Sequence, residues 1–287
     1  MTLKTAFIGL GAMGAPMAGH LRSHGLLVAV ANRTRAKAEA LAAELGVGAP
    51  ASLAELAAQS DIVALCVTAD ADVLATVDAL APHLKPGSIV IDHSTVAPAT
   101  AQQAAARLAQ VGAHFLDAPV SGGVEGAKNG RLSVMVGGDS EVLERARPVL
   151  EAYALRITHL GEVGAGQATK AVNQVLVAGI AQAVCEGLAL GEALGLAPDR
   201  LIPTLGAGAA GNWFLDKRGA TMLRGEFDVG FKLGLLHKDL AIVRGIAEQA
   251  GTVHTVIDKS LADYAQLMRE GHGDEDISAL IRLKRAR

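Results

Sequence analysis

Hydrophobic and polar positions in the first half of the chain follow two alternating patterns. Short apolar runs, typical of buried strands, are separated by longer segments in which apolar residues recur with helical spacing. The runs lie at residues 5–9, 26–31, 62–67, 88–92 and 113–116, and the first helical segments lie at residues 12–24 and 36–45. This alternation predicts a parallel sheet covered by helices on both faces.

The pattern changes after the middle of the chain. Residues 132–136 and 156–159 predict two more strands, which we expect to be antiparallel at the sheet edge. Residues 169–194 predict one long apolar helix, and helical segments then continue with breaks at Pro198, Gly211, Gly225 and Gly251. We therefore expect an α/β domain over residues 1–163 and an all-α domain over residues 164–287, with the boundary in the glycine-rich stretch at residues 161–166.

A glycine motif lies between the first predicted strand and the first predicted helix. In this motif Gly9 permits a tight turn, Gly11 lets a pyrophosphate approach the backbone, and Gly14 lets the helix pack closely on the strand. The helix N-terminus then offers N–H groups to the phosphates. An ordinary glycine-rich turn is the alternative. The position in the first βαβ unit favours a dinucleotide site formed by Gly9, Leu10, Gly11, Ala12, Met13 and Gly14.

The end of the second predicted strand indicates which dinucleotide is bound. An Asp or Glu there would bind the adenine ribose hydroxyls of NAD, whereas this chain has Asn32, Arg33 and Thr34. The absence of a carboxylate removes repulsion against a 2′-phosphate, and the guanidinium of Arg33 suits that phosphate. The sequence therefore predicts NADP, with NAD possible as the cofactor. The alternative is that Arg33 is a solvated loop residue.

Composition and charge count against several other classes of protein. The formal net charge is only −3 over 287 residues, so we expect no nucleic-acid partner. Cys66 and Cys185 lie in apolar runs without metal-ligand spacing, and His20 and His24 lack a third ligand, so we expect no metal. The chain starts without a signal-peptide pattern and has no uninterrupted apolar run of about 18 residues, so we expect a cytoplasmic protein without a membrane span.

Several segments narrow the prediction when they are taken together and in order. They are residues 7–18 around the glycine motif, residues 117–123 (DAPVSGG), residues 164–173 (GAGQATKAVN), residues 238–240 (KDL) and residues 273–279 (GDEDISA). These segments resemble the signatures of the β-hydroxyacid dehydrogenases, a family that includes 3-hydroxyisobutyrate dehydrogenase, tartronate semialdehyde reductase and the glyoxylate/succinic semialdehyde reductases. The resemblance extends over nearly the whole chain.

The resemblance implies a Rossmann domain followed by a helical domain, an active site in the cleft between them, and a homodimer or homotetramer formed through the helical domain. It makes Lys170 the catalytic proton carrier, at the start of an apolar helix where desolvation favours the neutral amine needed for proton transfer. Asn173 lies on the same helical face and could hold the reacting oxygen or the lysine. Without the resemblance, Lys170 would be interpreted as an exposed lysine at a helix start.

Other residues are predicted to bind the substrate or the nicotinamide side of the cofactor. Ser121, Gly122 and Gly123 could cup a carboxylate with a hydroxyl and backbone N–H groups, or could form a plain loop. Gln174 stands where the family often has a second Asn. Lys238 would lie near the cofactor or the substrate carboxylate, the alternative being a surface ion pair with Asp239. Val67, Thr68 and Thr95 match positions that line the nicotinamide, although helix capping would also explain these threonines.

The predicted function is that of an oxidoreductase moving a hydride between NADP(H) and a small 3-hydroxy acid or its semialdehyde. The partner would be a small carboxylate substrate. An imine reductase and a catalytically idle dinucleotide-binding protein are the alternatives. Imine reductases usually replace the lysine with another proton donor, and an idle protein has no need of Lys170 and Asn173.

Overall fold

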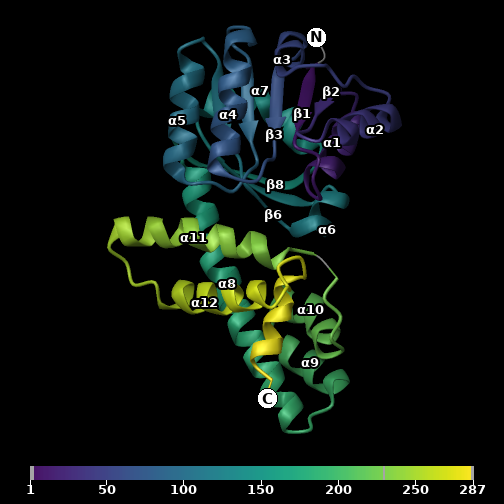
Figure 1. The fold of residues 1–287 in the computed structure, drawn as a ribbon, viewed down its shortest axis with the longest axis vertical. Helices are drawn as coiled ribbons and strands as arrows, with labels where there is room; N and C mark the ends of the chain where they lie inside the picture. The colour runs from purple at the N-terminus through teal and green to yellow at the C-terminus, as the bar shows by residue number, and fades with distance from the viewer. Residues whose placement is uncertain (1–2, 229, 286–287) are drawn as a thin grey trace. The chain divides into compact units, whose positions relative to one another are not determined.

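The computed structural model describes residues 3–228 and 230–285. The chain divides into two compact units, Met1–Lys170 and Ala171–Arg287. The first unit is a sheet covered by helices and the second is built from helices, as the sequence predicts (Figure 1). The predicted domain boundary at residues 163 and 164 stays a prediction.

The sheet of the first unit is parallel over most of its width. Its strands have the order β2-β1-β3-β4-β5-β7-β6, and β8 also pairs with β7. The parallel part consists of β1 (Thr5–Ile8), β2 (Leu27–Ala31), β3 (Ile62–Leu65), β4 (Ile89–Asp92) and β5 (His114–Asp117). At the edge, β7 (Leu132–Gly137) runs antiparallel to β5 and to β6 (Val120–Ser121), and parallel to β8 (Ala154–Gly161). β7 thus runs antiparallel to the parallel strands as predicted, and β8, which is parallel to β7, has the same direction.

Helices cover both faces of this sheet because successive strand residues point to opposite sides. Phe7 packs with α1 (Gly14–Ser23), α2 (Arg35–Leu45) and α7 (Ser140–Glu151) in one core. Its neighbours Ala6 and Ile8 pack with the opposite layer in a second core. That layer contains α3 (Leu53–Gln59), α4 (Asp70–Leu80) and α5 (Pro98–Ala109) (Figure 1). The short elements η1 (Ala81–His83) and α6 (Gly123–Lys128) complete the unit.

The helical unit is organised around α8 (Ala165–Ala193), which begins in the first unit. The other elements are α9 (Pro198–Gly206), α10 (Trp213–Leu223), α11 (Leu233–Ala250), α12 (Thr255–Arg269) and η2 (Ile277–Leu283). Buried Cys185 and Leu188 of α8 share a core with Leu236 of α11 and Tyr264 of α12. The predicted breaks hold, since α9 begins at Pro198 and Gly251 ends α11 in the left-handed conformation.

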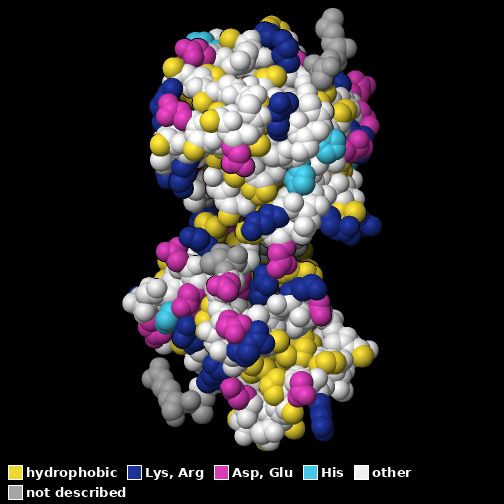
Figure 2. All heavy atoms as spheres, turned by 90° about the vertical axis from the view of Figure 1, so that its right-hand side faces the viewer, with side chains coloured by type: hydrophobic (Ala, Val, Ile, Leu, Met, Phe, Trp, Pro, Cys, Tyr) yellow, Lys and Arg dark blue, Asp and Glu magenta, His cyan; other side chains and the backbone are white. Residues whose placement is uncertain are grey.

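One helix within the described ranges, α8, is long and apolar enough to cross a membrane by length and composition alone. The buried apolar side chains of α8 belong to the core of the helical unit. The central helix of a folded domain meets the same length and composition criterion, because its core-facing side is apolar. Val172, Leu176 and Leu190 on α8, and Leu194 directly after it, are nevertheless exposed. Hydrophobic side chains gather on one face of this unit in Figure 2.

Candidate active site

The glycine motif forms the turn from β1 into α1, and its three glycines differ in what they permit. A Cβ at Gly9, where φ is 94°, would collide with the carbonyl oxygen of Cys66, and a Cβ at Gly14 would collide with the carbonyl oxygen of Gly9. A Cβ at Gly11 would meet no described atom within 4 Å. The fold therefore requires glycine at positions 9 and 14. The lack of a side chain at Gly11 instead leaves space beside the turn where the sequence predicts that a pyrophosphate binds.

The loop after β2 is tied to this motif by Asn32. Its side-chain oxygen accepts a 3.0 Å hydrogen bond from Leu10 N–H, and its amide nitrogen donates to the carbonyl oxygen of Thr34. The side chain of Arg33 is 88% exposed and lies 3.9 Å from the carboxylate of Asp72, a loose pair in water. The structure thus gives Asn32 a bridging role that the sequence does not reveal, and leaves Arg33 accessible to an anion.

The loops after β3 and β4 meet at the carboxyl edge of the sheet. Val67 N–H donates a 2.9 Å hydrogen bond to Ser94 Oγ, which joins the two loops. Asp70, at the start of α4, accepts from Ala97 N–H and from the hydroxyl of Thr100. Of the predicted nicotinamide-side residues, Val67 and Thr95 are half-buried and Thr68 is exposed. Ligands of open parallel sheets bind outside this edge.

Two buried titratable residues, Asp92 at the end of β4 and His93 directly after it, lead into the second of these loops. His93 Nδ1 contacts the carbonyl oxygen of Ala118, and its Nε2 lies 2.8 Å from the hydroxyl of Tyr153. Burial lowers the pKa of His93 to about 4. The imidazole is therefore neutral near pH 7, with Nδ1–H donating to the carbonyl and Nε2 accepting from the tyrosine.

Asp92 has a carboxyl group with only one partnered oxygen. Its Oδ1 accepts from Ser94 N–H at 2.8 Å, while Oδ2 is buried and has no hydrogen-bond partner among the described residues. The pKa of this carboxyl is raised from 3.8 to about 7, chiefly by burial and slightly by the nearby carboxylates of Asp117 and Asp70, against the lowering effect of the Ser94 hydrogen bonds. The folded protein therefore keeps Asp92 protonated to a much higher pH than an exposed aspartate would be.

We expect Asp92→Asn to make the protein more stable than the wild type at pH 8, and the difference to shrink steadily as the pH is lowered from 7 toward 4. The folded state binds this proton more tightly than the unfolded chain does, so the stabilisation is complete below the unfolded pKa and is lost as the pH rises through about 7. The wild-type free energy of unfolding should fall by up to about 1.4 kcal/mol per pH unit because of this group. Urea denaturation of both proteins at several pH values measures the difference, and parallel curves would contradict the assignment.

The start of α8 is fixed to the sheet by Asp117 at the end of β5. Its two carboxylate oxygens accept from Gly164 N–H at 2.8 Å and from Gln167 N–H at 2.9 Å. A carboxylate at a helix N-terminus satisfies N–H groups that the helix itself leaves unpaired. A Cβ at Gly166 would lie 2.5 Å from the carbonyl oxygen of Met135 and 2.6 Å from that of Asp117, so only glycine allows this approach. The DAPVSGG segment contains this anchor, but the sequence does not identify its partners.

Lys170 lies one turn further along α8 and is only 8% exposed. Its Nζ donates a 2.9 Å hydrogen bond to the carbonyl oxygen of Val120. The next residues are half-buried Ser121, then Gly122 and Gly123, whose φ values are 131° and 61°. The fold therefore brings the ammonium of Lys170 to the strand that leads into the predicted substrate turn. An exposed lysine at a helix start, the alternative interpretation, does not describe this side chain.

The remaining predicted residues form a polar chain within the helical unit. Asn173 donates to the side-chain oxygen of Gln174, and Gln174 donates to Asp239 Oδ2 at 2.7 Å. Lys238 Nζ lies 2.9 Å from Asp239 Oδ1. Asp239 is buried and joins α8 to α11, a role the sequence does not suggest beyond the KDL motif. Lys238 does form the ion pair with Asp239 that was the alternative interpretation of this lysine. This pair belongs to a network that also contains the candidate residues Asn173 and Gln174.

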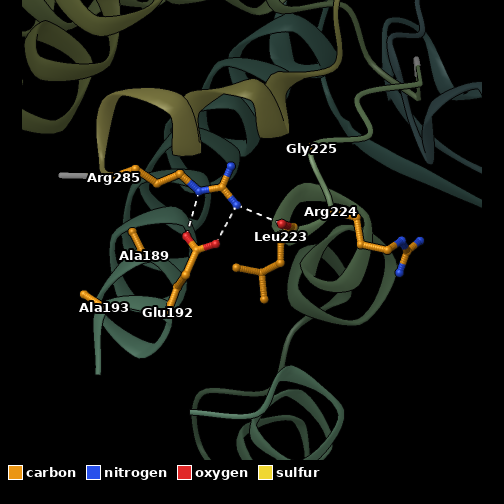
Figure 3. A pocket seen from close by; sticks show the side chains of 7 residues that line it. All are labelled: Ala189, Glu192, Ala193, Leu223, Arg224, Gly225 and Arg285. Atoms are coloured by element: carbon orange, nitrogen blue, oxygen red, sulfur yellow. Dashed lines mark hydrogen bonds and ion pairs between the residues drawn. The ribbon is translucent and has the colours of Figure 1, made fainter. Parts of the chain in front are cut away.

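A surface pocket elsewhere in the helical unit contains none of the predicted site residues (Figure 3). It is lined by Ala189, Glu192, Ala193, Leu223, Arg224, Gly225 and Arg285. The guanidinium of Arg285 donates to both carboxylate oxygens of Glu192 and to the carbonyl oxygen of Leu223. With its charge paired in this way, Arg285 offers no evident anion site, and the pocket is not a candidate for the reaction.

Comparison with known proteins covers both halves of the chain. A profile described as the NAD binding domain of 6-phosphogluconate dehydrogenase matches residues 4–161. A second, described as NAD-binding of NADP-dependent 3-hydroxyisobutyrate dehydrogenase, matches residues 164–284. The fold and the glycine motif thus have counterparts in two nicotinamide-dependent enzymes.

Individual relatives match over nearly their full length. The chain is 41% identical to an uncharacterized oxidoreductase of Shewanella frigidimarina, with 99% of each chain covered. It is 35% identical to an NAD-dependent L-serine dehydrogenase of Pseudomonas aeruginosa, with 98% of this chain and 97% of the relative covered. Among solved structures, 3-hydroxyisobutyrate dehydrogenase of Mycobacterium tuberculosis with L-serine aligns over all of both chains, with a TM-score of 0.90 and 33% identity.

Proposed function

Because the chain belongs to the β-hydroxyacid dehydrogenase family, we propose that it moves a hydride between NADP(H) and a small 3-hydroxy acid or the corresponding semialdehyde. That it is a nicotinamide-dependent oxidoreductase of the hydroxyacid type follows from the family itself. The proposal concerns the choice of cofactor, the class of substrate and the roles of the individual residues.

The observation that carries the proposal is the buried ammonium of Lys170 beside the Val120–Ser121 strand. A bound nicotinamide supplies or accepts the hydride. Lys170 gives a proton to the carbonyl oxygen during reduction and takes it from the hydroxyl during oxidation. The hydroxyl of Ser121 and the backbone N–H groups of Gly122 and Gly123 hold the substrate carboxylate, and Asn173 orients the reacting oxygen.

In the helical unit, a polar network holds two of the predicted substrate-binding side chains in place. Gln174 and Lys238 both contact Asp239, which fixes their side chains before any ligand arrives. Pre-fixed groups lose less conformational freedom on binding. We assign Gln174 and Lys238 to substrate binding, with Lys238 able to neutralise a carboxylate or a cofactor phosphate.

The preference for NADP rests on the exposed Arg33 and the absence of a carboxylate at position 32. The backbone and side chains of residues 9–14 bind the pyrophosphate, while Asn32, Arg33 and Thr34 surround the 2′-phosphate. Val67, Thr68 and Thr95 line the nicotinamide side. The comparisons differ on the cofactor, since one relative is named as NAD-dependent and one family profile is described as NADP-dependent.

We expect Arg33→Ala to weaken NADPH binding by about 10- to 100-fold and to leave NADH binding nearly unchanged. A hydrogen bond to a charged group contributes about 1.5–3 kcal/mol, and only NADPH carries the 2′-phosphate that Arg33 would meet. Fluorescence titration of both cofactors measures the two dissociation constants. Arg35→Ala is the matched control, because Arg35 is exposed nearby but pairs with Glu39. An equal loss for both cofactors would contradict a role in phosphate recognition.

A panel of substrates tests the proposed function as a whole. NADPH and NADH are each tried with glyoxylate, succinic semialdehyde and tartronate semialdehyde, and the oxidised cofactors with 3-hydroxyisobutyrate and L-serine. L-Serine is included because one relative is named as an L-serine dehydrogenase and one solved relative is described with this molecule. We expect turnover with at least one member of the panel and a higher kcat/KM with the NADP form. More efficient use of NADH would reject the cofactor preference.

Two alternative functions give different results once a cyclic imine is added to this panel. A catalytically idle dinucleotide-binding protein would bind NADPH but turn over no member of the panel. An imine reductase would reduce a cyclic imine and ignore the semialdehydes. The relatives named as dehydrogenases and the buried position of Lys170 both favour the hydroxyacid dehydrogenase.

The exposed apolar side chains on α8 are consistent with a homodimer or homotetramer formed through the helical unit. Val172 and Leu176 lie one turn apart on this helix, and Leu190 lies near its end with Leu194 directly after it. Large apolar side chains that recur at this spacing on a surface are typical of a protein interface. A second copy of the chain would remove them from water.

A further inference from the structure

We propose that Gln167 is a positioning residue that fixes the helix carrying Lys170 against the loop on the nicotinamide side of the site. This inference rests on the proposed function and extends it to a residue outside the predicted catalytic and binding set. All the contacts that support it lie within residues 3–170.

The side chain of Gln167 makes two complementary hydrogen bonds to one loop. Its Nε2 donates to the carbonyl oxygen of Ser94 at 2.8 Å, and its Oε1 accepts from Val96 N–H at 3.1 Å. These backbone groups flank Thr95. Gln167 is 1% exposed, so water cannot replace either bond without rearrangement. Only a side chain offering both a donor and an acceptor at this distance can make the pair of bonds.

The backbone of Gln167 belongs to a second anchor. Its N–H donates to Asp117 Oδ2, while Gly164 N–H donates to Asp117 Oδ1. Gly166 packs against backbone atoms of two strands, with no room for a Cβ. The position of the helix start is therefore set by the sheet through Asp117. The loop at residues 94–96 is then held to that start through the Gln167 side chain.

The loop held by Gln167 is itself connected to the rest of the cofactor edge. Ser94 Oγ accepts from Val67 N–H, and Ser94 N–H donates to Asp92 Oδ1. A change at Gln167 would thus reach Val67 and Thr95, both predicted to line the nicotinamide, without touching the cofactor directly. This is what distinguishes a positioning residue from a binding residue.

Lys170 follows Gln167 by three residues and so lies on the same side of α8. Hydride transfer to a carbon and proton transfer to the oxygen bonded to it must end on neighbouring atoms. The distance between the nicotinamide-side loop and the Lys170 ammonium therefore has to be held closely. Misplacement by about 1 Å can cost about 100-fold in rate. Gln167 links these two parts, because its side chain contacts the loop and its backbone belongs to the helix that carries Lys170.

The test compares Gln167→Met and Gln167→Glu with the wild type, using NADPH and the best substrate of the panel. Gln167→Met keeps the length but removes both hydrogen bonds. We expect kcat at saturating NADPH to fall about 10- to 100-fold, and the dissociation constant for NADPH to change by less than about threefold. Gln103→Met, the same change on an exposed residue of α5, is the matched control and should behave as the wild type.

Gln167→Glu supplies a readout that a purely structural role would not produce. An ionised glutamate can accept from Val96 N–H but cannot donate to the carbonyl oxygen of Ser94, whereas a protonated glutamate can do both. The ratio of its kcat to that of the wild type should therefore rise as the pH falls, and the ratio for Gln167→Met should stay flat. Thermal unfolding midpoints identify any variant that is simply unfolded at the assay temperature.

The outcomes separate this inference from the proposed function. Loss of kcat in Gln167→Met together with recovery of Gln167→Glu at low pH supports the inference. Wild-type kcat in both variants, or a loss that follows only the unfolded fraction and shows no pH recovery, overturns it while the proposed function stands. If the wild type turns over no substrate of the panel, the proposed function fails and this inference falls with it.

Discussion

Replacing Lys170 by alanine is expected to lower kcat by about 10²- to 10⁴-fold, the range that a positioned general acid or base contributes. The dissociation constant for NADPH should stay close to that of the wild type, because Lys170 donates to the carbonyl oxygen of Val120, outside the glycine motif that is predicted to bind the pyrophosphate. Steady-state kinetics on the best substrate and fluorescence titration of NADPH measure the two quantities separately.

Two further variants distinguish the proton-transfer role from a structural one. Lys170→Arg keeps a positive charge but holds its proton too strongly to exchange it near pH 7, so it should be as impaired as the alanine variant. Lys85→Ala, at an exposed lysine of the same unit, is the control for general loss of charge. Near-normal kcat in Lys170→Arg, or loss of NADPH binding together with kcat in Lys170→Ala, would show that the ammonium serves the fold.

Gly11→Ala should weaken NADPH binding by at least about 100-fold without lowering the free energy of unfolding. A methyl group at this position meets no described atom within 4 Å, so the protein alone accommodates it. The methyl would instead occupy the space of the pyrophosphate and remove its contacts with the backbone N–H groups. Two lost hydrogen bonds to a charged group, at about 1.5 kcal/mol or more each, account for the size of the effect.

Gly14→Ala is the matched comparison, because the same methyl group there would collide with the carbonyl oxygen of Gly9. That variant should lose stability as well as binding. Urea denaturation and NADPH titration of both proteins therefore separate a glycine needed by the cofactor from a glycine needed by the fold. Tight NADPH binding by a stable Gly11→Ala protein would remove the main argument for placing the pyrophosphate at this turn.

The longer elements of the fold could be predicted because their apolar pattern is continuous. The strands at Ile62–Leu65 and Ile89–Asp92 are buried at every position, which is what a run of apolar residues indicates. The strand Val120–Ser121 and the helix Gly123–Lys128 were not predicted. Two residues carry no periodicity, and the helix begins at a glycine pair that reads as a turn.

The candidate site was predictable in its parts but not in its connections. The glycine motif and Lys170 stand out by local sequence or by resemblance, and the structure places the motif at the turn from β1 into α1 and Lys170 Nζ beside the carbonyl oxygen of Val120, while their roles stay predictions. The partners of Asp117 and Gln167 lie 47 to 73 residues away along the chain, so no local pattern relates them. Buried polar groups must find hydrogen-bond partners, but a single sequence does not say which.

The bridge from Leu10 to Asn32 has a consequence for how cofactor choice could change during evolution. The bridging atom is an oxygen that accepts a backbone hydrogen bond, and aspartate presents the same oxygen at the same place. A codon for asparagine becomes one for aspartate by a single base substitution. The chain is thus one mutational step from a residue that repels a 2′-phosphate and binds a ribose diol, with the anchoring of the nucleotide loop preserved. Lineages that use NAD and lineages that use NADP could therefore diverge from such an ancestor while every intermediate stays folded.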